Sequence, residues 1–259
     1  SFRGRQVINR ICLDCGLVYQ SPRLTEIESA AFYVEEYRLL QEGSTDPTAR
    51  NMAVQKKRVK ALLDFVQPLI PSISRHLDIG CSMGILLQHF QGTYHNHSVG
   101  IEPGEAHRAQ AYKHGLKVYA SLEEMERTGE AYFDLVSMSH VLEHLPDPVG
   151  YLIHLRESLL ARDGWLLLEV PNLYAHDSFE VAHLFAFSPH TLQEVLCRSG
   201  FDIIKFEQHG RPNSQLIPFY LTALCRPAQL QDLSPVRPEH NASLKRRAGM
   251  LRRRLIERL

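Results

Sequence analysis

The chain has 259 residues, which is enough for one large domain with a well-buried core. Its 44% hydrophobic and 22% charged residues exclude a disordered protein, and its 29 basic residues balance 29 acidic ones, so no overall field attracts nucleic acid. Because no apolar run approaches the roughly 20 residues that cross a bilayer, and the first residues have no apolar centre, we expect a cytoplasmic protein without a transmembrane segment or signal peptide.

The first predicted segment, residues 1–24, is short and β-rich or irregular, and it carries Cys12 and Cys15 in a CxxC pair. This pair is half of a zinc ribbon, and a closed structural zinc site needs four ligands. No matching second pair is visible in the sequence; further cysteines upstream of Ser1 would make zinc binding at Cys12 and Cys15 natural, and zinc binding within these residues is the less favoured alternative.

A helical lid is predicted over residues 25–70. Thr25 and Glu28 have the spacing of a capping box at the start of its first helix. A second helix is expected over about residues 48–66, with lysines and an arginine on one face and apolar residues on the other.

A doubly wound α/β domain is predicted over residues 71–226, where short apolar runs alternate with helical segments in the pattern of a parallel sheet covered by helices. The expected parallel strands cover residues 76–79, 98–101, 117–119, 134–138 and 165–170. A helix and two antiparallel strands should complete the domain, over residues 189–198, 201–207 and 216–225.

The last segment, residues 227–259, is predicted to be a polar linker and a basic helix. Leu244, Ala248, Leu251 and Leu255 fall on one stripe, and we expect the helix to pack through that stripe or to connect to a further domain. The alternative is that its lysines and arginines contact an anionic membrane surface, nucleic acid or polyphosphate, although the stripe lacks the aromatic residues that interfacial helices use.

The sharpest motif is HLDIGCSMGILL, residues 76–87, in which an apolar strand and an acid precede a glycine turn and a helix. Gly80 and Gly84 let the backbone approach a ligand closely, and the turn directs peptide N–H groups towards it. Glu102 ends the next strand, where an acid accepts hydrogen bonds from ribose hydroxyls. Since the spacing is GxxxG and not GxGxxG, a nucleoside without phosphates is favoured over a dinucleotide. A plain strand-to-helix turn is the alternative for this motif taken alone.

Two further apolar strands end in polar residues, in FDLVSMSHVLEHLPDP, residues 133–148, and in WLLLEVPN, residues 165–172. Doubly wound sheets build their ligand crevice at the carboxyl ends of the strands. All four motifs therefore indicate a ligand site at that edge of the sheet.

In this order, the four motifs resemble those of the class I S-adenosylmethionine-dependent methyltransferases, over roughly residues 70–210. The resemblance implies a Rossmann-like, mostly parallel seven-stranded sheet with an antiparallel last strand, and S-adenosylmethionine as the cofactor. At Cys81-Ser82-Met83 the sequence departs from the family, which more often has small residues with a central glycine there. The implied cofactor contacts are Asp78, Gly80, Cys81 and Gly84 around the methionine moiety, Glu102 and Pro103 at the ribose, Ser121 and Leu122 near the adenine, and Ser139 and His140 on the sulfonium side.

A narrower resemblance suggests the acceptor. CLDCGLVYQSPRLTEIESAAFY and HLFAFSPHTLQEVLCRSGF resemble the branch that methylates sugars, sugar nucleotides or glycans in bacterial surface-glycan and natural-product biosynthesis. C-methylating members usually have Glu-His where this chain has Ala182-His183, so the missing acid favours O-methylation. The LEHLPDP turn also resembles methyltransferases that act on quinones or lipid-like phenols, and a non-catalytic binding module is a third hypothesis.

A hydroxyl acceptor must lose a proton, and histidine is the side chain that titrates near neutral pH. His183 and His144 are the candidate bases or acceptor-orienting residues. For His144, helix capping or a hydrogen bond in the core is an equal alternative. Tyr33 and Tyr37, at positions i and i+4, either contact the acceptor from the lid or simply pack.

Overall fold

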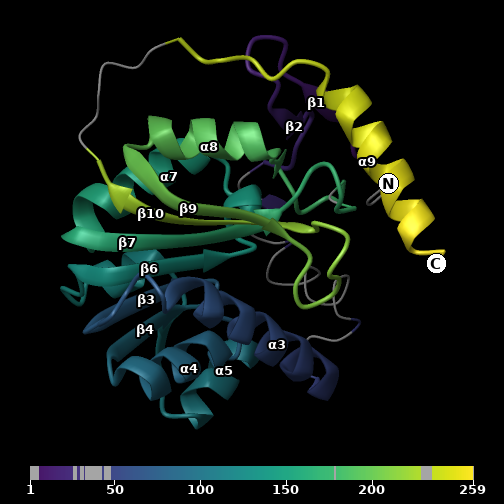
Figure 1. Ribbon diagram of the computed structural model, residues 1–259. Coiled ribbons are helices and arrows are strands. Elements are labelled where there is room, and N and C mark those ends of the chain that lie inside the picture. The colour runs from purple at the N-terminus through teal and green to yellow at the C-terminus, as the bar shows by residue number, and fades with distance from the viewer. Residues whose placement is uncertain are drawn as a thin grey trace. The chain divides into compact units, whose positions relative to one another are not determined.

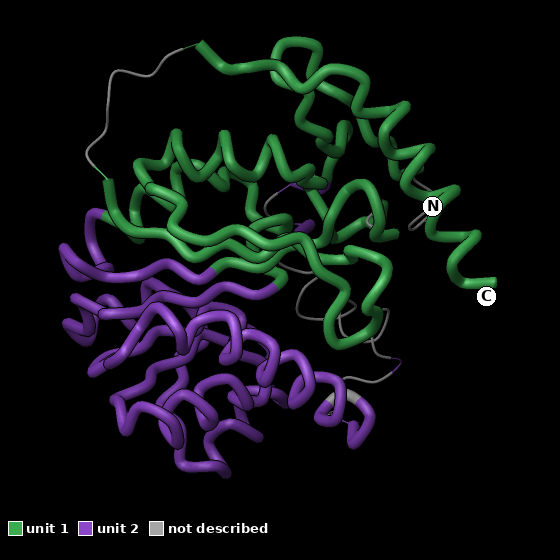
Figure 2. The backbone as a smooth tube through the Cα atoms, in the orientation of Figure 1, with its two compact units in different colours: residues 1–23, 140–156, 168–259 green, residues 24–139, 157–167 purple. Residues whose placement is uncertain are grey.

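The computed structural model describes residues 6–25, 28–29, 32, 43, 48–177, 179–228 and 235–258. Its main sheet has seven strands in the order β5-β4-β3-β6-β7-β10-β9, and helices lie along it (Figure 1). The predicted doubly wound α/β fold is therefore confirmed. The chain divides into two compact units, coloured separately in Figure 2. Tyr33, Tyr37 and most of the predicted lid helix lie outside the described residues.

Unit 2 comprises Leu24–Ser139 and Glu157–Leu167 and holds four parallel strands. These strands, each found within two residues of its predicted bounds, are β3 (Arg75–Ile79), β4 (His97–Ile101), β5 (Lys117–Tyr119) and β6 (Phe133–Ser139). The helices of this unit are α3 (Ala49–Val66), α4 (Ile85–Tyr94), α5 (Glu105–Lys113) and α6 (Leu122–Glu126).

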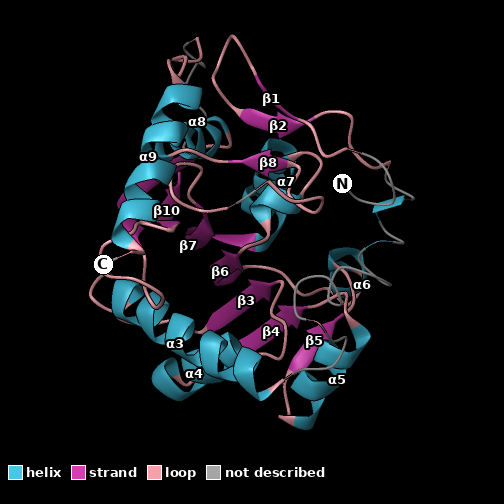
Figure 3. Cartoon of the chain, turned by 90° about the vertical axis from the view of Figure 1, so that its right-hand side faces the viewer, coloured by secondary structure: helices cyan, strands magenta, loops and turns pink. Residues whose placement is uncertain are grey.

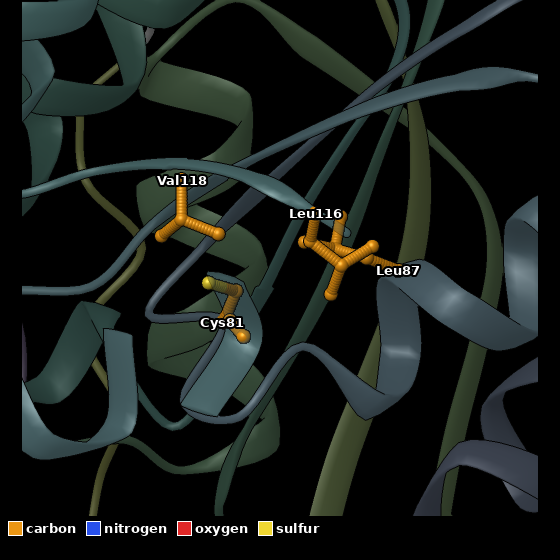
Figure 4. Close-up of a cluster of buried hydrophobic side chains, with 5 residues drawn as sticks. Cys81, Leu87, Leu116 and Val118 are labelled. Carbon is orange, nitrogen blue, oxygen red and sulfur yellow. The ribbon is translucent and has the colours of Figure 1, made fainter. Parts of the chain in front are cut away.

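The register of these strands explains how unit 2 packs beside its first glycine turn. Asp78 in β3 lies opposite Gly100 in β4 and Ser137 in β6. Because Gly100 has no side chain, the thiol of Cys81 fits against that strand. Cys81 thereby joins an apolar cluster drawn in Figure 4, whose members are Cys81, Leu87, Ala111, Leu116 and Val118.

Unit 1 comprises Ser1–Arg23, His140–Arg156 and Leu168–Leu259. Its strands β9 (Phe201–His209) and β10 (Tyr220–Pro227) pair antiparallel, as predicted. The strand β7 (Leu160–Pro171) begins in unit 2 and ends in unit 1. The helices described in unit 1 are η1 (Leu142–His144), α7 (Pro148–His154), α8 (Pro189–Arg198) and α9 (Ala242–Ile256), and η2 (Leu155–Leu159) begins in unit 1 and ends in unit 2.

Two strand starts differ from their predictions. Strand β7 begins at Leu160 and not at residue 165, because Arg162, Asp163 and Gly164, whose sequence is typical of a turn, continue the extended backbone. Strand β10 begins at Tyr220 and not at residue 216, because residues 210–217 form a turn and Pro218 has no N–H group to donate to a neighbouring strand.

The N-terminal segment forms a small second sheet in unit 1. Its strands are β1 (Asn9–Ile11), β2 (Val18–Gln20) and β8 (Phe185–Ala186), in the order β1-β2-β8 (Figure 3). Further on, Thr25 and Glu28 make the predicted capping-box hydrogen bonds between side chain and backbone. The domain boundaries at residues 24, 70 and 226 stay predictions.

The packing predicted for the C-terminal helix is wrong. Leu244, Leu251 and Leu255 are exposed, and α9 contacts unit 1 through Arg246 and Arg253 instead. The physical reason is that backbone carbonyl oxygens and aromatic rings contact the guanidinium groups of Arg246 and Arg253. Leucine side chains have no N–H groups that could bond to these carbonyl oxygens. Among the described residues, no helix has the length and apolar character needed to span a bilayer.

Candidate active site

The turn after β3 has the left-handed backbone that its glycine motif predicts. Gly80, Ser82 and Gly84 have φ values of 76°, 52° and 75°, a left-handed backbone that favours glycine. Gly84 is the N-cap of α4, and a Cβ added there would collide with Leu116. Several N–H groups of the turn bond within the protein: those of Gly80 and Cys81 donate to the carbonyl of Ile101, and that of Gly84 donates to the carbonyl of Cys81. The predicted direction of N–H groups towards a ligand stays a prediction.

Glu102, directly after β4, is buried and holds this turn in place. One oxygen of its carboxylate accepts the N–H of Ser82 at 2.9 Å, and the other accepts the N–H of Gly104 at 2.8 Å. The backbone N–H of Glu102 donates to the carbonyl of Tyr119 at the end of β5. Glu102 thus connects the turn after β3 to the start of α5.

Ser82 replaces the central glycine that is usual in the family and adopts the same left-handed conformation. Its hydroxyl lies 2.7 Å from Nδ1 of His107, which is fully buried in α5, and accepts a hydrogen bond from Gln55 at 3.0 Å. These two contacts offset the steric cost of a side chain at positive φ. The departure in the sequence therefore fixes the turn to α3 and α5.

Asp78, near the end of β3, is a buried acid with an unusual pKa. Burial raises the pKa of Asp78 from 3.8 to about 7, and the charge of Glu102 adds to the shift, while a hydrogen bond from Ser137 at 2.6 Å opposes it. Ser137 also lies 2.8 Å from Nε2 of His76, whose pKa burial lowers to about 3. A cationic ligand beside Asp78 would favour its ionised form.

The other predicted cofactor residues of unit 2 lie at the ends of strands. Ser121 caps α6 by accepting the N–H of Glu124, and Leu122 is buried beside it. The thiol of Cys81 points into the apolar cluster of Figure 4, so a cofactor contact at this position would come from its backbone. Pro103 is exposed, and Ser139 is the last residue of β6. These assignments stay predictions.

A second group of polar side chains lies in unit 1, around the buried carboxylate of Glu143 in η1. We call it the Glu143 cluster. One carboxylate oxygen of Glu143 lies 3.5 Å from His140, 3.9 Å from His144 and 4.0 Å from His183. The cluster consists of His140, Glu143, His144, Glu180 and His183.

The structure brings the two candidate bases together. The rings of His144 and His183 meet edge to face, with centroids 4.8 Å apart. Nδ1 of His144 bonds to the carbonyl oxygen of Ala182 at 2.9 Å, which orients that ring. Nε2 of His183 lies 3.3 Å from Glu180. Two acids, Glu180 and Glu143, therefore lie near His183, although the residue before it in the sequence is Ala182.

His140 connects the Glu143 cluster to another buried acid, Glu169 in β7. The two ring nitrogens of His140 each lie 3.5 Å from one of these carboxylates. Glu169 also lies 3.4 Å from His209 and accepts a hydrogen bond from Thr222 at 3.1 Å. The result is a continuous polar network inside unit 1.

Three ligand atoms of the Glu143 cluster lie within 4.8 Å of one another, one each from Glu143, His144 and His183, a spacing that could hold a metal ion. In the described part of the chain, this group does not include Cys12 or Cys15. Hydrogen bonds from the backbone of Cys15 lower the pKa of Cys12, and burial raises the pKa of Cys15. Zinc at the CxxC pair stays a prediction.

Several residues of these two groups had no role predicted from the sequence: Gln55, Ser82, His107, Glu143, Glu169, Glu180 and His209. Glu143 precedes a candidate base in the LEH turn, and Glu169 ends a predicted strand, so position along the chain was a usable signal for both. His209 has no such signal, because only the antiparallel pairing of β9 with β10 brings it near Glu169.

A glycine turn after the first strand, a buried acid after the second and a polar network at the ends of β6 and β7 define a class I methyltransferase. The family described as "Methyltransferase domain" matches residues 50–205, which is more than half of the chain. The chain therefore belongs to this methyltransferase family.

Among curated proteins, the chain is similar to the ubiquinone biosynthesis O-methyltransferase of Hahella chejuensis (strain KCTC 2396), with 36% identity over 101 residues, which cover 35% of this chain and 41% of that protein. It is also similar to the protein of the same name from Aromatoleum aromaticum (strain DSM 19018 / LMG 30748 / EbN1), with 30% identity over 165 residues, 61% of this chain and 64% of that protein. The chain thus spans less than two thirds of the length of these relatives.

Among solved structures, the fold is similar to that of the Burkholderia thailandensis 1,6-didemethyltoxoflavin-N1-methyltransferase with bound 1,6-didemethyltoxoflavin and S-adenosylhomocysteine. The TM-score is 0.62 at 18% identity, and the match covers 85% of this chain and 99% of that one. At this identity the similarity supports the fold alone.

S-adenosylmethionine is the cofactor that the sequence resemblance implies for a member of this family. The residues of unit 2 fit that cofactor on their own geometry. Glu102 lies directly after the second strand, where an acid can accept ribose hydroxyls, and its carboxylate holds the N–H groups of Ser82 and Gly104. The buried carboxyl of Asp78 suits a ligand that carries a sulfonium and an ammonium group.

The sugar, sugar-nucleotide or glycan acceptor predicted from the sequence is wrong, since the curated relatives are ubiquinone biosynthesis O-methyltransferases. The two segments that suggested this acceptor have a structural role that does not involve it. They contain β2 and β8, which pair through Val18 with Ala186 and Tyr19 with Phe185. Both segments therefore contain residues that form the small sheet.

Proposed function

We propose that this chain transfers a methyl group from S-adenosylmethionine to a hydroxyl oxygen of a quinone precursor or lipid-like phenol. The observation that carries the proposal is the 30–36% identity to curated ubiquinone biosynthesis O-methyltransferases. The resemblance of the LEHLPDP turn to methyltransferases of that kind supports it. Because the reaction draws on S-adenosylmethionine, we place it in the cytoplasm.

In this proposal, unit 2 binds the methyl donor. Glu102 accepts the ribose hydroxyls, the Gly80–Gly84 turn surrounds the methionine moiety with Asp78 beside it, and Ser121 and Leu122 lie near the adenine. Methyl transfer from a sulfonium is an in-line displacement, so the protein mainly aligns the two reactants and excludes water. S-adenosylmethionine supplies the methyl group.

The Glu143 cluster removes the proton of the acceptor. A phenol ionises near pH 10, so a base that accepts its proton makes the oxygen a far better nucleophile at neutral pH. His183 takes this proton, and the carboxylates of Glu180 and Glu143, at 3.3 Å and 4.0 Å from its Nε2, stabilise the imidazolium that forms. His144 orients the acceptor.

A transfer assay with methyl-labelled S-adenosylmethionine tests the proposed function. Short-chain analogues of hydroxylated quinone precursors are offered beside matched analogues whose hydroxyl groups are already methylated. We expect label in the ether product of the former and none in the latter. Binding of the methyl donor without transfer to any of these phenols would overturn the proposed acceptor class.

The affinity for S-adenosylmethionine should rise with pH up to about 7, the pKa to which burial raises Asp78. The native protein holds a proton there that the unfolded chain loses above its ordinary pKa of 3.8, so the stability from Asp78 is complete below about pH 4 and is lost as the pH rises through 7. A cationic cofactor favours the ionised carboxylate, so binding expels this proton, and the Kd falls by up to about tenfold per pH unit below 7.

Isothermal titration calorimetry at several pH values between about 5.5 and 8 measures this slope. Asp78→Asn removes the titrating group and should give a Kd that is nearly independent of pH. The same slope in Asp78→Asn and in the wild-type chain would assign the effect to a different group.

A further inference from the structure

The C-terminal helix α9 presents an apolar strip to solvent. Leu244, Leu251 and Leu255 are 66%, 59% and 64% exposed. At about 100° per residue, these three side chains lie within about 40° of one another around the helix. We call this strip the leucine face.

Contacts on the opposite side of α9 fix its orientation on unit 1. Arg246 donates to the carbonyl oxygen of Leu173, and Arg253 donates to that of Ala175 at 3.2 Å. Gly249 lies so close to the same loop that a Cβ at this position would collide with it. The leucine face therefore points outward because the other side of the helix is specifically held.

Cations surround the leucine face. The sequence from 242 to 258 has seven basic residues and a single acid, Glu257, which bonds to Arg253 at 2.7 Å on the inner side. Two further basic residues are also occupied by the protein, Arg246 as above and Lys245 with Glu239 at 3.0 Å. The four exposed arginines that flank the leucines are Arg247, Arg252, Arg254 and Arg258.

We propose that the leucine face of α9 docks on an anionic membrane surface. A helix with an apolar strip flanked by arginines lies in the interface plane, with its leucines at the boundary between headgroups and acyl chains and its guanidinium groups on lipid phosphates. Negatively charged lipids attract such basic segments. An anionic membrane surface thus matches both the leucines and the arginines of this face of α9.

Two other occupants fit less well. A second copy of the chain on the same face would bring exposed arginines of equal charge together, which costs free energy. Nucleic acid would match the arginines but would cover the three leucines with phosphates, at the centre of the contact. A lipid surface is the partner that offers anionic groups and an apolar layer at adjacent depths.

Docking by α9 stands independently of the proposed acceptor. An enzyme on a membrane surface meets lipid-like phenols where they are most concentrated, so the two proposals agree. The transfer assay on short-chain phenols needs no membrane, however, and sedimentation with vesicles needs no acceptor. Failure of one therefore leaves the other intact.

Co-sedimentation with lipid vesicles tests the docking. The wild-type chain is mixed with vesicles of phosphatidylcholine alone, or with about one third phosphatidylglycerol added. We expect at least about tenfold stronger binding to the anionic vesicles, weakened by added salt. Combined replacement of Leu244, Leu251 and Leu255 by serine should reduce that binding at least about tenfold, and Arg247→Gln, Arg252→Gln and Arg254→Gln together about 100-fold.

A matched variant distinguishes the effect of α9 on vesicle binding from the effect of the overall charge of the protein. Lys56→Gln, Lys57→Gln and Lys60→Gln remove three exposed cations from α3, and this variant should bind the anionic vesicles as the wild type does. An equal loss of binding in this variant would overturn the proposal, as would vesicle binding that is absent or insensitive to the serine replacements. A change of molar mass in light scattering caused by the serine replacements, without vesicle binding, would assign the face to a second copy of the chain.

Discussion

Replacing Glu102 by alanine is expected to weaken S-adenosylmethionine binding by at least about 100-fold. Each hydrogen bond from a ribose hydroxyl to the carboxylate contributes about 1.5–3 kcal/mol, because the acceptor is ionised. The replacement also removes the acceptor of the Ser82 and Gly104 N–H groups, at 2.9 and 2.8 Å, so the turn that surrounds the cofactor loses its anchor. Calorimetric titration with S-adenosylhomocysteine measures the loss.

The matched control is Glu105→Ala, which removes an exposed acid from the first turn of α5 and should change the affinity less than about twofold. Thermal unfolding of the Glu102→Ala variant distinguishes lost binding from lost folding. If a folded Glu102→Ala protein bound the cofactor as tightly as the Glu105→Ala protein, the ribose would have to lie elsewhere, and the assignment of unit 2 as the donor site would be wrong.

The turn and the acid of the proposed cofactor side could be placed from the sequence because their signals are local. The strands of unit 2 are apolar runs of ordinary length, and the turn and the acid follow directly at the ends of β3 and β4. Glu102 and Ser82 are only 20 residues apart and meet because neighbouring parallel strands end at the same edge. Residues that directly follow neighbouring parallel strands in the sequence therefore also lie close together in space.

The acceptor side was only partly predictable, because its contacts join segments far apart in the chain. His144 and His183 were predicted as candidate bases from residue type and from their places between strand and helix. Their contact through Ala182 spans 38 residues, and no local pattern encodes it. The predicted acceptor class was wrong, and the two segments that suggested it contain β2 and β8, which pair with each other in the small sheet.

The periodic pattern of leucines in the C-terminal helix does not determine which side of the helix faces the protein. A stripe of leucines predicts an amphipathic helix, but it does not say whether the stripe faces the protein or an external apolar phase. The hydrogen bonds of Arg246 and Arg253 determine the orientation of α9, and their carbonyl partners lie 73 and 78 residues earlier in the chain. Charged residues at a packing face are uncommon, so the sequence favoured the opposite orientation.

Replacing His183 by alanine should lower kcat for a phenolic acceptor by about 100- to 10,000-fold, the range for loss of a general base. The affinity for S-adenosylmethionine should be unchanged, because Asp78 and Glu102, the proposed donor contacts, belong to unit 2 and His183 to unit 1. Since the phenol ionises without help near pH 10, the rate of the variant should rise about tenfold per pH unit towards that value. Single-turnover transfer of labelled methyl groups across that pH range measures the effect.

A merely structural role for His183 makes a different prediction, so the pH profile decides between the two. If the side chain only held the Glu143 cluster together, kcat would fall by a similar factor at every pH, and high pH would not restore it. His154→Ala is the matched control, because it removes an exposed histidine at the end of α7 and should leave kcat and its pH dependence unchanged. Glu180→Gln, which keeps the size of the side chain 3.3 Å from His183 but removes its charge, should lower kcat by a smaller factor of about ten. Only a base at position 183, assisted by that carboxylate, accounts for recovery in the first variant together with a partial loss in the last.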